Sequence, residues 1–288
     1  MAIKIYEKQF SKTLQSIFTT KQRFFETFGG SLQTAYGAEY DDKFMHIKTS
    51  PKNNVIIQKY DTGANVAFGT GTGNSNRFGP RQEIKSVDTA VGYDDPIAVH
   101  AGIDRFTCND IPEQLVAEYA ASHANAWVKH LNTYMADLLN KSAGKTLQTA
   151  LTEDGISKLF FEARKHYINS EISDGITWAA YVNADVYNLL VEHKLTTPNK
   201  LNAGNIGEQI INKFKGFVLR EVPDQYFKDN ACAIFAPDNV GVIGVGINTY
   251  RVIDSADFNG VAIQGAGKTA NYIPEENKVA IVKATIGA

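Results

Sequence analysis

The strongest periodic pattern in the chain lies in its centre. Apolar residues recur there at steps of three, four and seven, at Leu115, Tyr119, Trp127, Leu131, Tyr134, Leu138 and Leu139. This spacing places them on one face of an α-helix. Asp110 followed by Glu113 has the spacing of a capping box, and Gly144 is a candidate stop. The pattern predicts one helix over Pro112–Lys141, about 45 Å long at about 1.5 Å per residue.

The segment Met1–Phe28 has a weaker amphipathic pattern. Its apolar residues repeat at three- and four-residue steps, at Phe10, Leu14, Ile17 and Phe18 and again at Phe24, Phe25 and Phe28. Five basic and two acidic residues give it a net charge of +3. We predict one amphipathic helix or two short ones, ended by Gly29-Gly30. Two interpretations are open: a helix packed on its own domain, or an arm that lies on a neighbouring copy of the chain.

Between residues 40 and 93 the pattern becomes strand-like. Val55–Tyr60 and the alternating stretch Gln82–Tyr93 are the predicted strands. The connection between them is rich in Gly, Thr, Asn and Ser, and five glycines fall within Gly63–Gly79. We predict a long two-stranded hairpin with a polar, glycine-rich tip. Because an isolated two-stranded ribbon is marginally stable in water, it should lie against its own body or another chain.

Beyond residue 151, helical and strand-like segments alternate. The predicted helices are Ile156–Tyr167 and Ala184–His193. The predicted strands are Thr177–Val182, Phe217–Val222, Ala231–Phe235, Val240–Val245, Val261–Ile263 and Val279–Ile286. The order is therefore an amino-terminal segment, a hairpin, one long helix and a mixed α/β part that ends in strands.

Composition narrows the function classes. The 288 residues include 29 basic and 31 acidic ones, for a formal net charge of −2. This near-neutral charge argues against a dedicated nucleic-acid-binding protein, which is usually strongly basic. No run of about 18 apolar residues predicts a membrane span, and the first residues lack the apolar core of a secretory signal. Two cysteines, Cys108 and Cys232, cannot form a disulfide framework and suit a reducing compartment.

Two glycine clusters have the composition of nucleotide-binding loops but not their context. Gly69–Gly73 could cradle a phosphate, but no helix can start in the residues that follow, and no Gly-Lys-Ser/Thr sequence is present there. Gly241, Gly244 and Gly246 also lack the helix of a dinucleotide fingerprint. We interpret the first cluster as a mobile hairpin tip and the second as a site of bulging or close packing within a strand.

Histidines, cysteines and acidic residues form no recognisable catalytic or metal-binding pattern. His123 and His130 are seven residues apart, and no His-Glu-x-x-His, Cys-x-x-Cys or Gly-x-Ser-x-Gly sequence occurs. Asp41-Asp42 and Asp94-Asp95 fit solvated turns. We therefore predict no catalytic residues, no metal and no cofactor, although a triad assembled from distant positions stays open.

The order of elements resembles that of the major capsid proteins of tailed bacteriophages, which have the Hong Kong 97-type fold. Gly216–Pro223 resembles a strand of that family, with alternating apolar residues before Val-Pro, and so do the stretch 233–246 and the closing Val279–Ile286. The resemblance implies an α+β fold in five parts: an amino-terminal arm (1–40), an extended hairpin loop (41–95), a peripheral domain (96–169) with its spine helix (112–141), an axial domain (170–251) and a return to the peripheral domain (252–288).

This resemblance implies a structural subunit rather than an enzyme. Its partners would be neighbouring copies of itself in hexamers and pentamers, which assemble in the host cytoplasm into an icosahedral virion shell. The shell would contact double-stranded DNA without sequence specificity and would involve no membrane. Separate scaffolding and portal proteins are expected, since no long extension precedes the arm. Contacts between subunits are expected at the loop residues Phe68, Arg77 and Phe78 and at the arm residues Phe10, Phe18 and Arg23.

Two alternatives remain open from the sequence. The first is an encapsulin-like nanocompartment shell protein, which would enclose enzymes instead of DNA. The second is a soluble α/β enzyme whose glycine-rich loop closes over a cleft. The enzyme would be a monomer or a small oligomer, whereas either shell protein would form particles of megadalton size.

Overall fold

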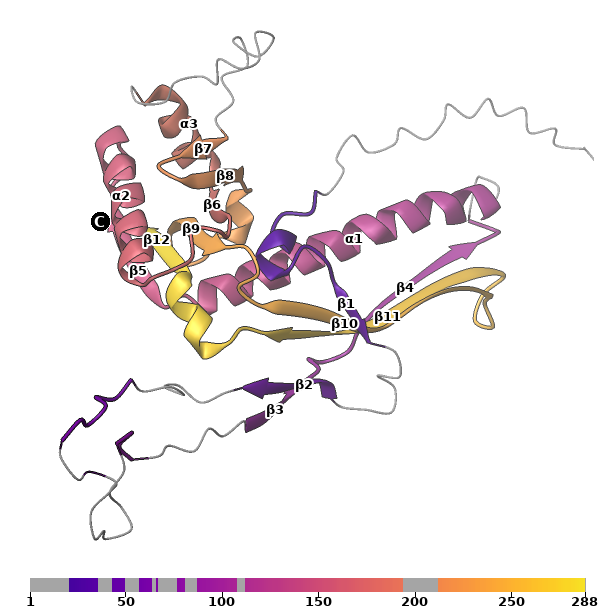
Figure 1. Ribbon diagram of the computed structural model, residues 1–288. Coiled ribbons are helices and arrows are strands. Elements are labelled where there is room, and N and C mark those ends of the chain that lie inside the picture. Colours follow the sequence, from indigo (N-terminus) through magenta and orange to yellow (C-terminus); the bar gives the residue numbers. More distant parts are fainter. Residues whose placement is uncertain are drawn as a thin grey trace, which may run out of the picture.

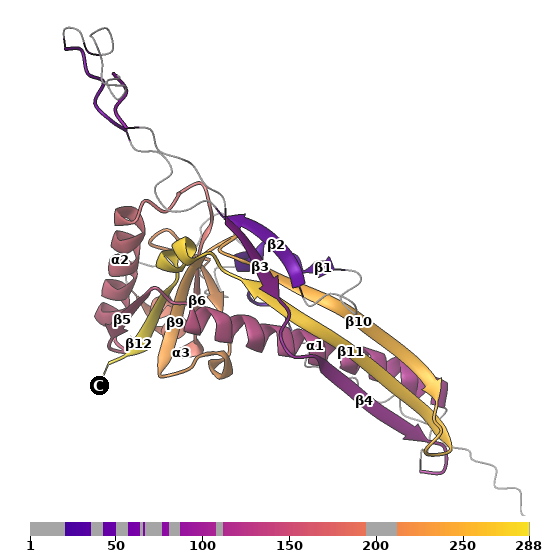
Figure 2. The same cartoon turned by 90° about the horizontal axis from the view of Figure 1, so that it is seen from below.

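The computed structural model describes residues 21–35, 43–49, 57–63, 66, 77–80, 87–107, 112–193 and 212–287. The elements in chain order are η1 (Phe25–Phe28), β1 (Gln33–Ala35), β2 (Lys43–Thr49), β3 (Val87–Gly92), β4 (Ile97–Asp104), α1 (Pro112–Lys141), β5 (Lys145–Thr149), α2 (Glu153–Asn169), β6 (Trp178–Val182), α3 (Ala184–Glu192), β7 (Lys213–Phe214), β8 (Phe217–Glu221), η2 (Asp224–Tyr226), β9 (Ala231–Pro237), β10 (Val242–Asp254), β11 (Gly260–Tyr272), η3 (Glu275–Ala280) and β12 (Val282–Ile286). Figures 1 and 2 show a body of helices and strands from which a long sheet and α1 extend side by side.

The helix α1 begins and ends at the predicted residues. It lies along one face of a four-stranded sheet with the order β1-β10-β11-β4, and the β2–β3 hairpin lies on the other side of that sheet (Figures 1 and 2). Leu131, Met135 and Leu139 of α1 are buried in one cluster with Ile243 and Val245 of β10. The predicted stripe packs in this core from Leu131 onward, which explains that part of the apolar period, whereas Tyr119 is 45% exposed.

The paired strands β10 and β11 are far longer than predicted, at 13 residues each. The prediction ended where glycine and polar residues interrupt the apolar pattern. In the structure the pairing register shifts between Gly246 and Thr249, so β10 continues across an irregularity. Gly244 is closely packed, because a Cβ atom there would overlap the ring of Phe44. Close packing, one of the two alternatives predicted for this glycine cluster, is confirmed at Gly244.

The second sheet has six strands in the order β5-β12-β9-β6-β8-β7. On one side, Phe160 of α2 packs edge-on against Phe235 of β9, with 5.0 Å between the ring centroids, in a cluster that also includes α3. Alternate residues of β6 belong to this cluster and to the cluster on the α1 side, so the strand is buried on both faces. A strand of this kind is a continuous apolar run, which is why Thr177–Val182 was predictable.

Several element ends and one predicted stop differ from the prediction, and three of these differences have a clear physical reason. Helix α2 begins earlier than Ile156, because Thr152 Oγ1 accepts a hydrogen bond from Gly155 N–H at 3.1 Å and acts as its N-cap. Gly144 is not the stop of α1; its N–H donates to Lys278 O at 3.0 Å, and a Cβ atom would overlap that carbonyl. The last strand starts only at Val282, because the residues before it form the 3-10 turn η3.

The amino-terminal segment packs on its own body in the part that the structure describes. Instead of a longer helix, residues 25–28 form a single 3-10 turn, which ends at Gly29 with φ 87°. Phe24 is fully buried, with its ring centroid 4.7 Å from that of Tyr181. A 3-10 turn places residues three apart on one side, and this directs both Phe25 and Phe28 into the core. The predicted Gly29-Gly30 end is confirmed, whereas residues 1–20 lie outside the described residues.

The hairpin is built from different strands than predicted. β3 lies within the predicted strand Gln82–Tyr93, but it pairs antiparallel with β2, from Lys43↔Gly92 to Thr49↔Val87. The predicted strand Val55–Tyr60 is wrong over its described part, because residues 57–60 form no strand and Ile57 is 96% exposed. Because these side chains are not buried on one face, packing does not hold the residues in a strand conformation.

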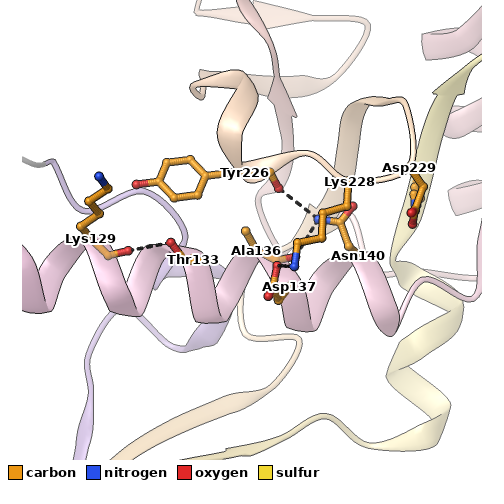
Figure 3. Close-up of polar contacts among 9 residues, drawn as sticks. Lys129, Thr133, Ala136, Asp137, Asn140, Tyr226, Lys228 and Asp229 are labelled. Atoms are coloured by element: carbon orange, nitrogen blue, oxygen red, sulfur yellow. Dashed lines mark hydrogen bonds and ion pairs between the residues drawn. The ribbon is translucent and has the colours of Figure 1, made fainter. Parts of the chain in front are cut away.

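Polar contacts join α1 to the segment that contains η2 (Figure 3). Asn140 is buried, and its Nδ2 donates to Ala136 O at 2.8 Å and to Tyr226 O at 3.1 Å. Lys228 Nζ pairs with Asp137 Oδ1 at 2.6 Å on the surface of the same helix. These contacts fix the six-stranded sheet against the last turns of α1.

The two sheets cross the part boundaries expected from the resemblance. β5 falls in the part 96–169 and β12 in the part 252–288, yet both are strands of the same six-stranded sheet as β6, β7, β8 and β9, and α2 packs against that sheet. β10 runs through the expected boundary at residue 251. The division into an arm, a loop, a peripheral domain and an axial domain therefore stays a prediction.

Candidate subunit-contact surface

The described parts of the hairpin loop lie away from the body. Segments 57–63 and 77–80 lie together beyond the β2–β3 hairpin (Figures 1 and 2). Asp61 N–H donates to Arg77 O at 2.9 Å, which joins the two segments through their backbones. The predicted return of the chain on either side of the glycine-rich stretch is therefore confirmed, although it takes place without a strand ladder here.

A second contact fixes the end of this return. Gln58 Nε2 donates to Pro80 O at 2.9 Å, and its side chain lies directly over Gly79. Gly79 has φ 78°, and a Cβ atom at this position would overlap Gln58. Glycine is therefore required by both the backbone conformation and the close approach.

Arg77 points into its own loop rather than out of it. Its Nε donates to Val66 O at 3.2 Å and its Nη1 to Asp61 O at 3.5 Å. The guanidinium thus contacts both Asp61 and Val66 and adds to the backbone hydrogen bond that joins the two segments. An additional contact of Arg77 with a neighbouring subunit stays a prediction.

Three apolar residues of the loop are exposed. Ile57 is 96% exposed, Phe78 76% and Tyr60 48%. The rings of Tyr60 and Phe78 pack edge-on with 5.1 Å between centroids. We call these three residues the loop apolar set. The sequence indicated Phe78 but not Ile57 or Tyr60, which were assigned to a strand. Their place in the short stretch that leads into Asp61-Thr62-Gly63 was the signal that could have identified them.

The other residues predicted to contact neighbouring subunits divide into two groups. Phe10, Phe18 and Phe68 lie outside the described residues. Arg23 contacts its own chain: its backbone N–H donates to Asn132 Oδ1 at 3.1 Å, and its guanidinium donates to Glu221 O. Arg23 and the loop apolar set therefore belong to different regions, the first beside β8 and the second beyond the hairpin.

The strongly perturbed phenols have structural roles. Burial raises the pKa of Tyr167 and of Tyr181 well above the usual phenol value. The Tyr167 hydroxyl donates to Ala280 O at 2.7 Å, and that of Tyr181 shares a hydrogen bond with Thr27 Oγ1 at 2.6 Å. Both hydroxyls therefore satisfy buried groups.

Cys232 and the histidines of α1 are also packed. Burial raises the pKa of Cys232 to about 11, so its thiol stays protonated at neutral pH. Trp127 lies between His123 and His130, and its Nε1 donates to His123 Nε2 at 3.2 Å. Within the described residues, no three His, Cys, Asp or Glu side chains are grouped to hold a metal ion, and no helix is long and apolar enough to cross a membrane.

No family model matches the sequence, and no curated protein matches it. Solved structures do match. A chain from Mycobacterium phage Che8 is 15% identical with a TM-score of 0.68, and the match covers 99% of this chain and 98% of that one. A chain of the bacteriophage PhiM1 mature capsid is 13% identical with a TM-score of 0.68, covering 99% and 93%. A chain of the capsid of the cyanophage P-SCSP1u is 13% identical with a TM-score of 0.67, covering 98% and 93%. The mixed helix and sheet fold of this chain is therefore, over nearly its whole length, the fold found in phage capsids.

Proposed function

We propose that the chain is the major capsid protein of a tailed phage and forms the shell of the phage head. The observation that carries the proposal is the extent of the match: the similarity covers nearly all of this chain and more than nine tenths of the two chains named as phage capsids. The whole subunit, including the long helix and the region of the hairpin, is therefore shared with proteins of capsid structures.

The surface of the subunit supports the same function. A soluble protein rarely leaves aromatic residues exposed without a reason when they lie close together. Tyr60 and Phe78 form such a pair on a loop that lies away from the body. In the proposed shell this loop lies on a neighbouring subunit, and the loop apolar set is buried there.

The assembled form follows from this arrangement. In the proposed shell, the loop of one subunit lies on a different part of its neighbour, so each contact is heterologous, and heterologous contacts close into rings when the rotation permits. We propose that these rings are hexamers and pentamers of an icosahedral virion shell, which encloses double-stranded DNA and assembles in the host cytoplasm. Separate scaffolding and portal proteins and a non-enzymatic role belong to the same proposal.

The test is the size and content of the particles that the full-length chain forms. We expect negative-stain electron microscopy and sedimentation to show megadalton shells, either of the chain alone or of the chain with its neighbouring genes. Shells recovered with those genes should contain double-stranded DNA, measured after nuclease treatment of the exterior. Shells that carry protein cargo without DNA would indicate a nanocompartment. Small discrete oligomers under every condition would overturn the shell function and favour the enzyme.

A further inference from the structure

The base of the hairpin is held to the body by contacts from both of its strands. On the β2 side, the ring of Phe44 occupies the space where a side chain of Gly244 would lie. Phe44 also packs edge-on against Tyr93, with 5.7 Å between centroids. Lys268 of β11 places its Nζ 5.7 Å from the centroid of the Tyr93 ring. This apolar half of the junction therefore connects β2 to both β10 and β11.

The polar half follows β3 and depends on Asp94. Its backbone N–H donates to Thr269 O of β11 at 2.8 Å. Its carboxylate accepts a hydrogen bond from the Tyr134 hydroxyl of α1 and a longer one, 3.5 Å, from Asn271 Nδ2 of β11. Asn271 Nδ2 also donates to the Tyr134 hydroxyl, so the three side chains form a closed triangle.

The pKa of Tyr134 determines which group donates the hydrogen bond between Tyr134 and Asp94. Burial, together with the hydrogen bond to Asp94, raises the pKa of Tyr134 well above the usual phenol value. The hydroxyl therefore remains a donor throughout the physiological range, and Asp94 is its charged acceptor. Hydrogen bonds to charged acceptors are stronger than those between neutral groups. A loop that only connected β3 to β4 would not need hydrogen-bonding partners on α1 and β11.

We propose that a clamp fixes the direction in which the β2–β3 hairpin leaves the body. The clamp consists of Phe44, Tyr93 and Asp94 together with their partners Tyr134, Gly244, Lys268 and Asn271. A ribbon of two strands has little stability of its own, so its direction has to come from such contacts. The role of this direction rests on the proposed function: in a shell, it determines which part of the neighbouring subunit the loop apolar set reaches.

The decisive variant is Tyr134→Phe, which removes the hydroxyl and keeps the ring. Its matched control is Tyr119→Phe, an exposed tyrosine on the same helix. We expect hydrogen–deuterium exchange of the full-length chain, with all variants in the same state of assembly, to become about tenfold faster in β2 and β3 for Tyr134→Phe. Exchange in α2 and β6 should not change, and the control should behave like the unmodified chain.

A second pair of variants tests the apolar half. Gly244→Ala introduces a methyl group where the Phe44 ring lies, so the same amides should exchange faster. Combining it with Phe44→Leu gives a smaller side chain room beside the new methyl group and should recover part of the protection. If Gly244→Ala prevents folding, Tyr134→Phe still decides the question.

Unchanged exchange in β2 and β3 for Tyr134→Phe would overturn the clamp. The proposed function is tested separately, because exchange requires a folded chain but not a shell. If the chain never forms shells but its variants show the expected exchange, the clamp is supported and the capsid function is refuted. If Tyr134→Phe forms normal shells and its exchange is unchanged, the capsid function is supported and the clamp is refuted.

Discussion

Replacing Phe78 by alanine should damage assembly while leaving the subunit intact. Phe78 is 76% exposed, so its ring contributes little to the core of its own chain. Truncating a residue of this kind changes the free energy of unfolding by less than about 0.5 kcal/mol. If the loop contacts a neighbouring subunit as proposed, the effect on assembly should be much larger, because that contact would bury the exposed ring.

The magnitude follows from the exposed area. A phenylalanine buries about 200 Å² when fully enclosed, so an exposed fraction of 76% leaves about 150 Å² for a neighbour to cover. At about 25 cal/mol per Å², covering it contributes up to about 4 kcal/mol for each contact. Incomplete burial and side-chain ordering reduce this value, and we expect about 2–4 kcal/mol, the range of an interface hot spot.

The assay compares shell yield at a series of subunit concentrations, by sedimentation and electron microscopy, with the thermal unfolding of unassembled subunits. Phe78→Ala should require at least tenfold more protein to assemble, whereas Phe78→Leu should retain much of the yield. Thr62→Ala, an exposed substitution on the same loop, is the matched control. Normal assembly of Phe78→Ala would refute the reasoning, and so would an equal loss of assembly and of folded subunit.

Further predictions concern the subunit itself. Phe160→Ala should lower the free energy of unfolding by about 3–5 kcal/mol in denaturant titrations, whereas the exposed neighbour Phe161→Ala should change it by less than about 0.5 kcal/mol. Gly144→Ala should cost about 1–3 kcal/mol in the same titrations, because its methyl group meets a backbone carbonyl, and Gly175→Ala should cost little because the nearest atom is 3.5 Å away. Since burial raises the pKa of Cys232, this thiol should resist alkylation at pH 8 until denaturant is added, and its share of the stability should fall as pH rises from about 9 to about 11.

The sequence predicted best the elements that bury a regular face. Helix α1 was predictable to the residue because its apolar stripe is long and meets a sheet. β2 was missed because it alternates Lys43, His46 and Lys48 with apolar residues in a short stretch without turn signals. The distal part of β10 was missed for another reason: Arg251–Asp254 are exposed, so their strand conformation comes from pairing with β11 and not from burial.

The loop was only partly predictable for a similar reason. The glycine-rich composition and the nearby Phe78 indicate an exposed tip from the sequence alone. The inward hydrogen bonds of Arg77 depend on where the carbonyls of Asp61 and Val66 lie, and no side-chain pattern encodes those positions. The triangle of Asp94, Tyr134 and Asn271 joins residues up to 177 positions apart and is equally invisible in the sequence.

The position of β12 has a consequence for the timing of folding. β12 lies between β5, with which it pairs in parallel from Lys145↔Val282, and β9, with which it pairs antiparallel from Phe235↔Val282. β5 is an edge strand and has no other neighbour in the sheet. During synthesis, β5 to β9 can therefore form only an incomplete sheet. β10 and β11 are synthesised before β12 can complete it. Pairings so distant in sequence form slowly. We therefore expect the six-stranded sheet to be completed, and β5 to gain its partner, only after β12 has emerged from the ribosome.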